Sequence, residues 1–212
     1  MNSGIADTGR VIASGLLCGL LVVLCAAPVL AGMELAQSSV GKGVVLVANP
    51  SMADPNFSQT VVLILEHGAE GTFGVILNRE TTMPLSEALP DIGALKGTKY
   101  RLFAGGPVAL ARLVLLFRVK EPPPDARPVI DGVYVGGTLE ILEHIVTRGK
   151  TNETFRVFAG FAGWAPNQLK FEMLQGAWGL LRVDSKDIFD HDPATLWQDS
   201  LTRLQAPRVI SN

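Results

Sequence analysis

The sequence VVLILEHGAEGTFGVIL, residues 61–77, predicts a β-hairpin. Two runs rich in aliphatic and β-branched residues, 61–66 and 73–77, flank a short loop that runs from His67 to Gly71. The glycines of this loop supply the positive φ angles that a tight connection between antiparallel strands needs. The chain is therefore expected to fold back on itself here.

Strand-like segments occur on both sides of this hairpin. Residues 43–48 form a β-branched run closed by Asn49-Pro50, and a proline favours extended geometry in the residue before it. Further strands are expected at residues 99–104, 112–119, 129–135, 154–159 and 178–183. The three prolines within residues 121–125 predict a stiff surface connection.

Helical patterns lie between these strands. A short helix or turn is expected at residues 84–89, and longer helices at 138–149 and from Pro166 to Gly176. A last helix follows Asp192-Pro193, with Leu196, Trp197, Leu201 and Leu204 along one face. Because strands and helices do not alternate regularly, the sequence predicts an α+β fold.

Two short segments of the chain resemble each other. Residues 102–106 read LFAGG and residues 157–161 read VFAGF. Each predicts a strand that ends in a Phe-Ala-Gly turn, and the second turn would extend through the glycine-rich residues 160–163. The two turns are expected to lie side by side at one rim of a curved sheet.

Composition and charge narrow the class of protein. The chain has 212 residues, of which 48% are hydrophobic and 18% are charged, which fits one compact domain. The formal net charge is -2, and the lysines and arginines are scattered singly along the sequence. Nucleic-acid binders concentrate basic residues in a patch, so no nucleic-acid partner is expected.

The N-terminal segment has the pattern of a secretory signal peptide. Residues 11–31 are almost wholly apolar, Arg10 precedes them, and Val29 and Ala31 are small residues suited to a cleavage site. An uncleaved membrane anchor and a translation start at Met33 remain as alternatives. The expected organisation is a leader helix over residues 1–31, a linker over 32–41 and one domain over 42–212.

Both cysteines, Cys18 and Cys25, belong to this leader. A domain without cysteine excludes a disulfide framework, a thiolate nucleophile and a cysteine-bound metal. The protein would be periplasmic or anchored in the membrane through residues 11–31 alone, and cytoplasmic if translation starts at Met33.

Several spaced motifs together resemble the YqgE/AlgH family over residues 43–204. They are Asn49-Pro50, Asp54-Pro55 with Phe57, residues 61–64, Glu66-His67, residues 74–79, Gly105-Gly106-Pro107-Val108, and Gly160 to Trp164 followed by Gln168-Leu169. The resemblance implies an α+β fold, with a small closed β-barrel or curved mixed sheet surrounded by helices. It also implies a historical label of transcriptional regulator, without a demonstrated DNA-binding element.

The chain departs from the family pattern at three positions. Asn167 stands where members often have glycine, Lys170 replaces a frequent acidic residue, and Phe161 replaces the commoner tyrosine. A ligand held elsewhere in the family by a hydroxyl at 161 or a carboxylate at 170 would not be held in the same way here.

Seven residues are candidates for binding a small polar ligand or a protein partner across one shared concavity: Asn78, Arg79, Gly105, Gly106, Trp164, Gln168 and Glu172. A guanidinium suits an anion, glycines allow a ligand close to the backbone, and an indole could stack on a ligand. The competing interpretation is structural. Arg79 would pair with Asp54 or Glu80, the glycines would form tight turns, and the indole, amide and carboxylate would satisfy buried groups.

No catalytic set, cofactor motif or metal site is expected from the sequence. The chain lacks a P-loop, a dinucleotide-binding motif and a serine nucleophile motif. Glu140 and His144 share a helix face but lack a third metal ligand. The sequence therefore favours a non-enzymatic binding or accessory protein, and the alternatives are an enzyme that uses Glu66, His67 or Glu172, and a transcriptional regulator.

Overall fold

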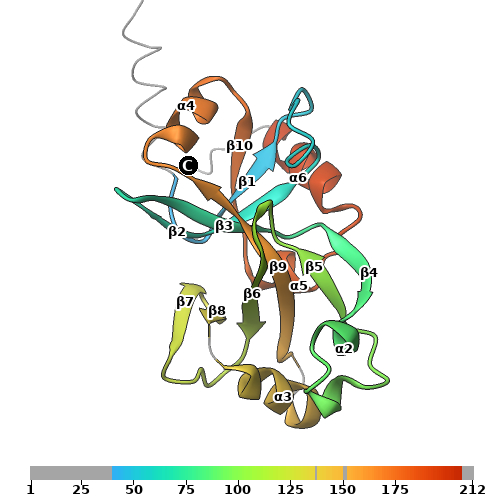
Figure 1. The fold of residues 1–212 in the computed structure, drawn as a ribbon. Coiled ribbons are helices and arrows are strands. Elements are labelled where there is room, and N and C mark those ends of the chain that lie inside the picture. Colours follow the sequence, from blue (N-terminus) through green and yellow to red (C-terminus); the bar gives the residue numbers. More distant parts are fainter. Residues whose placement is uncertain (1–39, 137, 150–151, 207–212) are drawn as a thin grey trace, which may run out of the picture.

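The computed structural model describes residues 40–136, 138–149 and 152–206 (Figure 1). The predicted leader, residues 1–31, and most of the predicted linker lie outside the described residues. Among the residues that are described, no helix is long and apolar enough to cross a bilayer.

One mixed sheet of ten strands organises the described chain. Its main path follows the order β10-β1-β2-β3-β9-β6-β8-β7, β4 pairs with β5, and β5 pairs in parallel with β9. The strands are β1 (Val44–Ala48), β2 (Val61–Gly68), β3 (Gly71–Ile76), β4 (Glu80–Pro84), β5 (Arg101–Ala104), β6 (Val108–Arg118), β7 (Ala126–Ile130), β8 (Val133–Gly136), β9 (Thr154–Trp164) and β10 (Trp178–Arg182).

The sheet is a strongly curled half-barrel, so the closed barrel implied by the family resemblance is corrected. The curl brings β7 back to the start of β1, where a Cβ on Gly43 would collide with the side chain of Ile130. The two end strands of the path are β10 and β7, and no ladder joins them in the described residues. The path therefore stays open.

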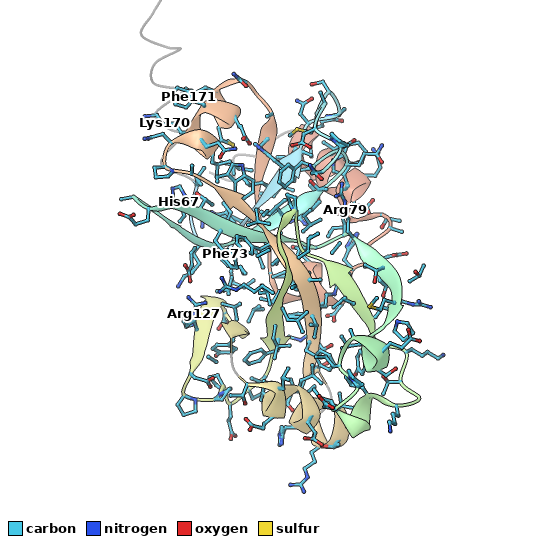
Figure 2. The ribbon with its side chains drawn as sticks, in the orientation of Figure 1. His67, Phe73, Arg79, Arg127, Lys170 and Phe171 are labelled. Atoms are coloured by element: carbon cyan, nitrogen blue, oxygen red, sulfur yellow. The ribbon has the colours of Figure 1, made fainter. Side chains whose placement is uncertain are left out.

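Five α-helices and one 3-10 helix are described, and they cover the two ends and one side of the sheet (Figure 1). They are α2 (Leu85–Ala88), η1 (Gly93–Leu95), α3 (Leu139–Arg148), α4 (Gln168–Leu174), α5 (Ser185–Phe189) and α6 (Leu196–Gln205). Helices α2 and α3 lie at the end opposite α4. Figure 2 shows Lys170 and Phe171 of α4 on the outer side of the molecule.

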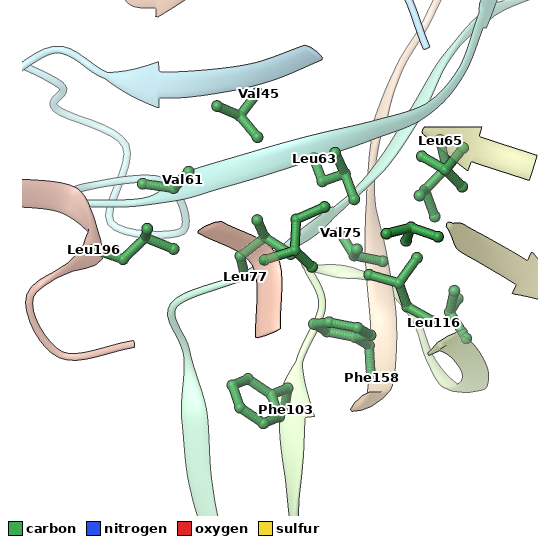
Figure 3. Close-up of a cluster of buried hydrophobic side chains, with 14 of the residues drawn as sticks. Val45, Val61, Leu63, Leu65, Val75, Leu77, Phe103, Leu116, Phe158 and Leu196 are labelled. Atoms are coloured by element: carbon green, nitrogen blue, oxygen red, sulfur yellow. The ribbon is translucent and has the colours of Figure 1, made fainter. Parts of the chain in front are cut away.

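The curled sheet buries apolar side chains on both of its faces. Along β2, alternate residues enter different cores: Val61, Leu63 and Leu65 pack with α5 and α6, whereas Val62 and Ile64 pack toward α4. Figure 3 shows the first of these clusters, with Leu196 of α6 beside Val61 and Leu77. Continuous apolar runs such as residues 61–65 therefore reflect burial on both faces.

The repeated Phe-Ala-Gly segments are neighbours, as predicted. Residues Leu102, Phe103 and Ala104 of β5 pair in parallel with Val157, Phe158 and Ala159 of β9. The expected turn at residues 160–163 is wrong, because β9 continues as a strand to Trp164. The glycines there allow backbones to approach closely, since a Cβ on Gly160 would lie 2.6 Å from the carbonyl oxygen of Gly106.

The single strand predicted over residues 129–135 is also wrong. The structure has two antiparallel strands, β7 and β8, that turn at Asp131-Gly132. Gly132 has a φ of 70°, the left-handed conformation that an Asp-Gly hairpin turn uses. The apolar residues on both sides of this turn resemble one strand when the turn is overlooked.

Smaller differences between the predictions and the structure concern two short elements and the start of one helix. The sequence predictions omitted β4 and α5, although Asp184 and Asp187 form a capping box at the start of α5. Helix α4 begins at Gln168, two residues after Pro166, because Asn167 takes a left-handed conformation with φ 66°.

Candidate functional site

Asn78 and Arg79 hold a long loop, residues 49–60, against the sheet. The Asn78 side chain accepts a hydrogen bond from the Val61 amide and donates one to the Gln59 carbonyl, both at 2.9 Å. The Arg79 guanidinium donates to the carbonyls of Pro55 and Ser58 at 3.1 and 3.3 Å. Both side chains therefore satisfy backbone groups of the 49–60 loop.

The charge of Arg79 is partly desolvated in this position. Burial lowers the pKa of Arg79, and the nearby Asp54 carboxylate partly offsets this effect. No ion pair joins Arg79 to Asp54 or Glu80 among the described residues, so the pairing considered from the sequence is replaced by bonds to backbone carbonyls. Asp54 itself accepts from the Asn56 amide within the loop.

Glu172 is the centre of a second polar cluster. Its Oε2 accepts hydrogen bonds from the indole Nε1 of Trp164 at 2.9 Å and of Trp178 at 2.8 Å. Its Oε1 accepts from the Gln168 amide at 2.9 Å, and Gln168 in turn accepts from the Ala165 amide. The carboxylate thus connects α4 to strands β9 and β10.

Phe57 joins the two groups of residues. Its ring stacks on Trp164 at 5.8 Å and meets Trp178 edge-on at 5.6 Å. Phe57 belongs to the 49–60 loop that Arg79 holds through the neighbouring carbonyls of Pro55 and Ser58. Asn78 and Arg79 therefore hold the loop by hydrogen bonds, and the cluster around Glu172 contacts it through the rings of Trp164 and Trp178. We call this arrangement the loop anchor.

Gly105 and Gly106 lie beside the loop anchor and pack against β9. The Gly105 amide donates to the Ala159 carbonyl, and the Gly105 carbonyl accepts from Ile76. A Cβ at Gly106 would overlap the backbone of Phe161. These glycines permit a close approach between two backbones, and the Gly105 amide is occupied by a protein carbonyl. Binding of a ligand by the seven predicted residues stays a prediction.

A hollow of about 290 Å³ opens elsewhere on the sheet, beside β6 and α3. We call it the β6–α3 hollow. Its lining consists of Phe73, Arg112, Leu113, Val114, Leu115, Arg127, Val135, Gly136, Thr138, Leu139, Leu142 and Val157. Figure 2 shows Phe73 and Arg127 on this side of the molecule. None of the seven residues predicted from the sequence lines this hollow.

Arg112 is the most distinctive group of the β6–α3 hollow. Its guanidinium carbon lies 5.7 Å from the ring centre of Phe73 and 5.6 Å from that of Phe161. Those rings lie 4.7 Å apart, so they support the cation together. Among the residues that the structure describes, the Arg112 side chain has no hydrogen-bond acceptor and no carboxylate partner. Its hydrogen-bond donors are free to bind an anion.

A second guanidinium, that of Arg127 on β7, contributes to the lining. Arg127 forms an ion pair with Glu66 of β2, and both side chains are more than half exposed. His67, the neighbour of Glu66, hydrogen-bonds through Nδ1 to Thr72 Oγ1 at 2.8 Å across the hairpin. Glu66, His67 and Glu172 therefore have three different sets of partners.

A second hollow, of about 330 Å³, includes Arg118 and Lys120 in its lining. The Arg118 guanidinium is already bound there by both carboxylate oxygens of Asp190, at 2.9 Å each. This neutralises the charge of Arg118, as Glu66 does for Arg127, so Arg112 is what makes the β6–α3 hollow the better site for an anion.

The pair that could have begun a metal site is engaged differently. Glu140 accepts a hydrogen bond from the Thr138 hydroxyl at the start of α3. Within residues 40–136, 138–149 and 152–206, no group of three or more His, Cys, Asp or Glu side chains is placed to hold a metal ion.

Comparisons with known proteins agree on one family. A family model described as AlgH-like matches residues 45–208. A UPF0301 protein of Streptomyces avermitilis is 35% identical over 182 residues, which are 82% of this chain and 91% of that protein. A UPF0301 protein of Cytophaga hutchinsonii is 32% identical over 174 residues, covering 81% and 94% of the two chains.

Solved structures show the same fold. The solution structure of the AlgH protein from Pseudomonas aeruginosa matches with a TM-score of 0.65 and 26% identity, over 78% of this chain and 89% of that one. A crystal structure of a protein from Corynebacterium diphtheriae matches with a TM-score of 0.64 and 26% identity, over 81% and 90%.

Proposed function

The chain belongs to the AlgH-like family, whose function is uncharacterised, and we propose that it is a non-enzymatic binding protein that takes an anionic ligand in the β6–α3 hollow. The single observation behind this proposal is the Arg112 guanidinium, which two aromatic rings hold at the hollow without a described carboxylate partner. A planar guanidinium with free donors suits a carboxylate or a phosphate.

The lining of the hollow favours binding over catalysis. Apart from its two arginines, its polar side chains are limited to Thr138, whose hydroxyl donates to Glu140. General acid–base or nucleophilic catalysis needs a carboxylate, histidine, serine or cysteine near the bound ligand. Glu66 lies near this lining through its ion pair with Arg127, but that partner occupies its carboxylate.

The place of action follows from the N-terminal sequence, and we propose that residues 11–31 export the protein or hold it in the membrane. Intact mass and fractionation of the native protein test this proposal. A chain that begins at Gly32 in the periplasm, or a full-length chain in the membrane, would support it. A soluble chain that begins at Met33 would contradict it.

Anion binding can be tested by titrating inorganic phosphate into the protein and following the titration by NMR. The sample is the form of the chain that the fractionation identifies. Replacing Arg112 with glutamine should weaken binding about tenfold or more, because a hydrogen bond to a charged group contributes about 1.5–3 kcal/mol. Arg148→Gln is the matched control, since Arg148 is an exposed arginine on α3 outside the hollow. Equal binding by the two variants, or no binding by the unmodified protein, would contradict the proposal.

A further inference from the structure

The lining of the β6–α3 hollow combines two guanidiniums with apolar side chains. Leu142 is fully buried, while Leu139 is 48% exposed and Leu113 is 39% exposed. The apolar surface therefore continues from a buried floor to an exposed rim. A small inorganic anion would contact the guanidiniums and leave this apolar surface in water.

The volume of the hollow limits the size of its occupant. Ligand sites have volumes of about 300–1,000 Å³, so about 290 Å³ is at the small end of this range. The hollow therefore suits a short single-chain ligand better than a long lipid.

The polar and apolar parts of the hollow are arranged for an amphiphile. Arg112 lies beside Phe73, while Leu115, Leu142 and Val157 contribute apolar lining. The N-terminus of α3 also borders the hollow, and Thr138 makes no side-chain cap to the helix backbone. The backbone N–H groups at this end of α3 add to the positive potential of Arg112, whereas Arg127 is paired with Glu66 and Thr138 with Glu140.

We propose that the ligand is a single-chain amphiphile, with a carboxylate or phosphate head bound by Arg112 and a short unbranched apolar chain packed along the hollow. This inference rests on the proposed anion-binding function and adds the chemical class of the ligand. The two possible heads share the same recognition chemistry, and the experiment separates them.

A chain-length series tests the proposal. Acetate, butanoate, hexanoate, octanoate and dodecanoate are titrated into the native protein, with octyl phosphate and the uncharged 1-octanol as comparisons. Each fully buried methylene improves affinity about fourfold, so affinity should rise with chain length and level off once the chain is longer than the hollow. Comparing the affinities of octyl phosphate and octanoate shows which head is preferred. Each series is repeated with Arg112→Gln, which measures the binding that does not depend on Arg112.

A second variant keeps the test independent of folding. Leu139→Glu places a negative charge at the rim of the hollow, where the first turn of α3 favours an acidic residue, so the helix should stay intact. We expect this variant to lose most of its affinity for octanoate, while Arg148→Gln binds as the unmodified protein does.

The outcomes separate this inference from the proposed function. Binding of all carboxylates with equal affinity, still dependent on Arg112, would overturn the amphiphile and leave the anion-binding function standing. Binding of 1-octanol as strongly as octanoate, without dependence on Arg112, would overturn the anion-binding function. Unchanged octanoate binding by Leu139→Glu would place the ligand outside the hollow and overturn the inference.

Discussion

Removing the Glu172 carboxylate tests the loop anchor at its centre. Glu172→Ala deprives the indole N–H groups of Trp164 and Trp178 of their acceptor, and both tryptophans are 4% exposed. It also frees the Gln168 amide. The two rings contact Phe57, so we expect the 49–60 loop to loosen together with this cluster.

The expected loss of stability follows from the two indole N–H donors that lose their acceptor. A buried donor left without a partner costs about 1–3 kcal/mol, so two indoles predict a loss of about 2–6 kcal/mol in the free energy of unfolding. Glu172→Gln should cost only about 1 kcal/mol. Its amide oxygen can still accept from both indoles, but its NH₂ group would face the NH₂ group of Gln168, so that one hydrogen bond is lost.

Urea unfolding, followed by tryptophan fluorescence and circular dichroism, measures these differences. Glu143→Ala is the matched control, because Glu143 is an exposed helical glutamate and its loss should change stability by less than about 0.5 kcal/mol. Hydrogen exchange at the Phe57 and Ser58 amides reports on the loop directly. A Glu172→Ala protein as stable as Glu143→Ala would refute the structural role and restore Glu172 as a ligand-binding candidate.

Three further changes test other parts of the structure. Arg156 is 9% exposed, donates to three backbone carbonyls and lies 4.9 Å from the Phe103 ring centre. Arg156→Ala should therefore lower the free energy of unfolding in urea by about 2–4 kcal/mol. A loss below about 1 kcal/mol would contradict this packing. Gly132→Ala should cost only about 1–2 kcal/mol, because the left-handed turn is strained by a Cβ but the space around it is open; a much larger loss would reveal a collision there. The hydrogen bonds from Arg118 lower the pKa of Asp190 from its ordinary value of 3.8. The stability that they contribute is therefore present above pH 3.8 and is lost as the pH falls through the lowered pKa. Asp190→Asn should flatten this acid dependence of the urea midpoint, and an unchanged pH profile would contradict the pair.

The backbone architecture could be predicted where local patterns decide it. The hairpin over residues 61–77 follows from β-branched runs around glycines, and the repeated Phe-Ala-Gly segments predict that those two segments are neighbours, though not their parallel register. The open sheet could not be predicted, because it depends on whether the end strands β10 and β7 meet, which no local pattern shows. The turn at Asp131-Gly132 did have a signal in the sequence, since Asp-Gly is a strong hairpin marker.

The contacts of the motif residues depend on partners far along the chain. Nothing local in the sequence shows that Arg79 reaches the carbonyls of Pro55 and Ser58, or that Glu172 collects two indoles. Glycines in motifs suggest turns or anion contacts, whereas Gly106 permits contact between two backbones.

The β6–α3 hollow was missed because its residues come from six separate elements, one of which is β8 with Val135 and Gly136. Phe73, Arg112, Arg127, Leu139 and Val157 belong to β3, β6, β7, α3 and β9, and only the curl of the sheet brings them together. Arg112 offered one weak signal: it is a single charge between apolar residues in a strand. A charge at such a position needs either water or a partner.

An NMR titration with octanoate tests the division between the loop anchor and the β6–α3 hollow most directly. Arginine Nε–H and tryptophan indole signals are followed in the same sample of the native protein. We expect the Arg112 signal to move with ligand concentration, while the Arg79 and Trp164 signals stay in place. Movement of Arg79 and Trp164 with Arg112 unchanged would contradict the account and place the ligand at the loop anchor.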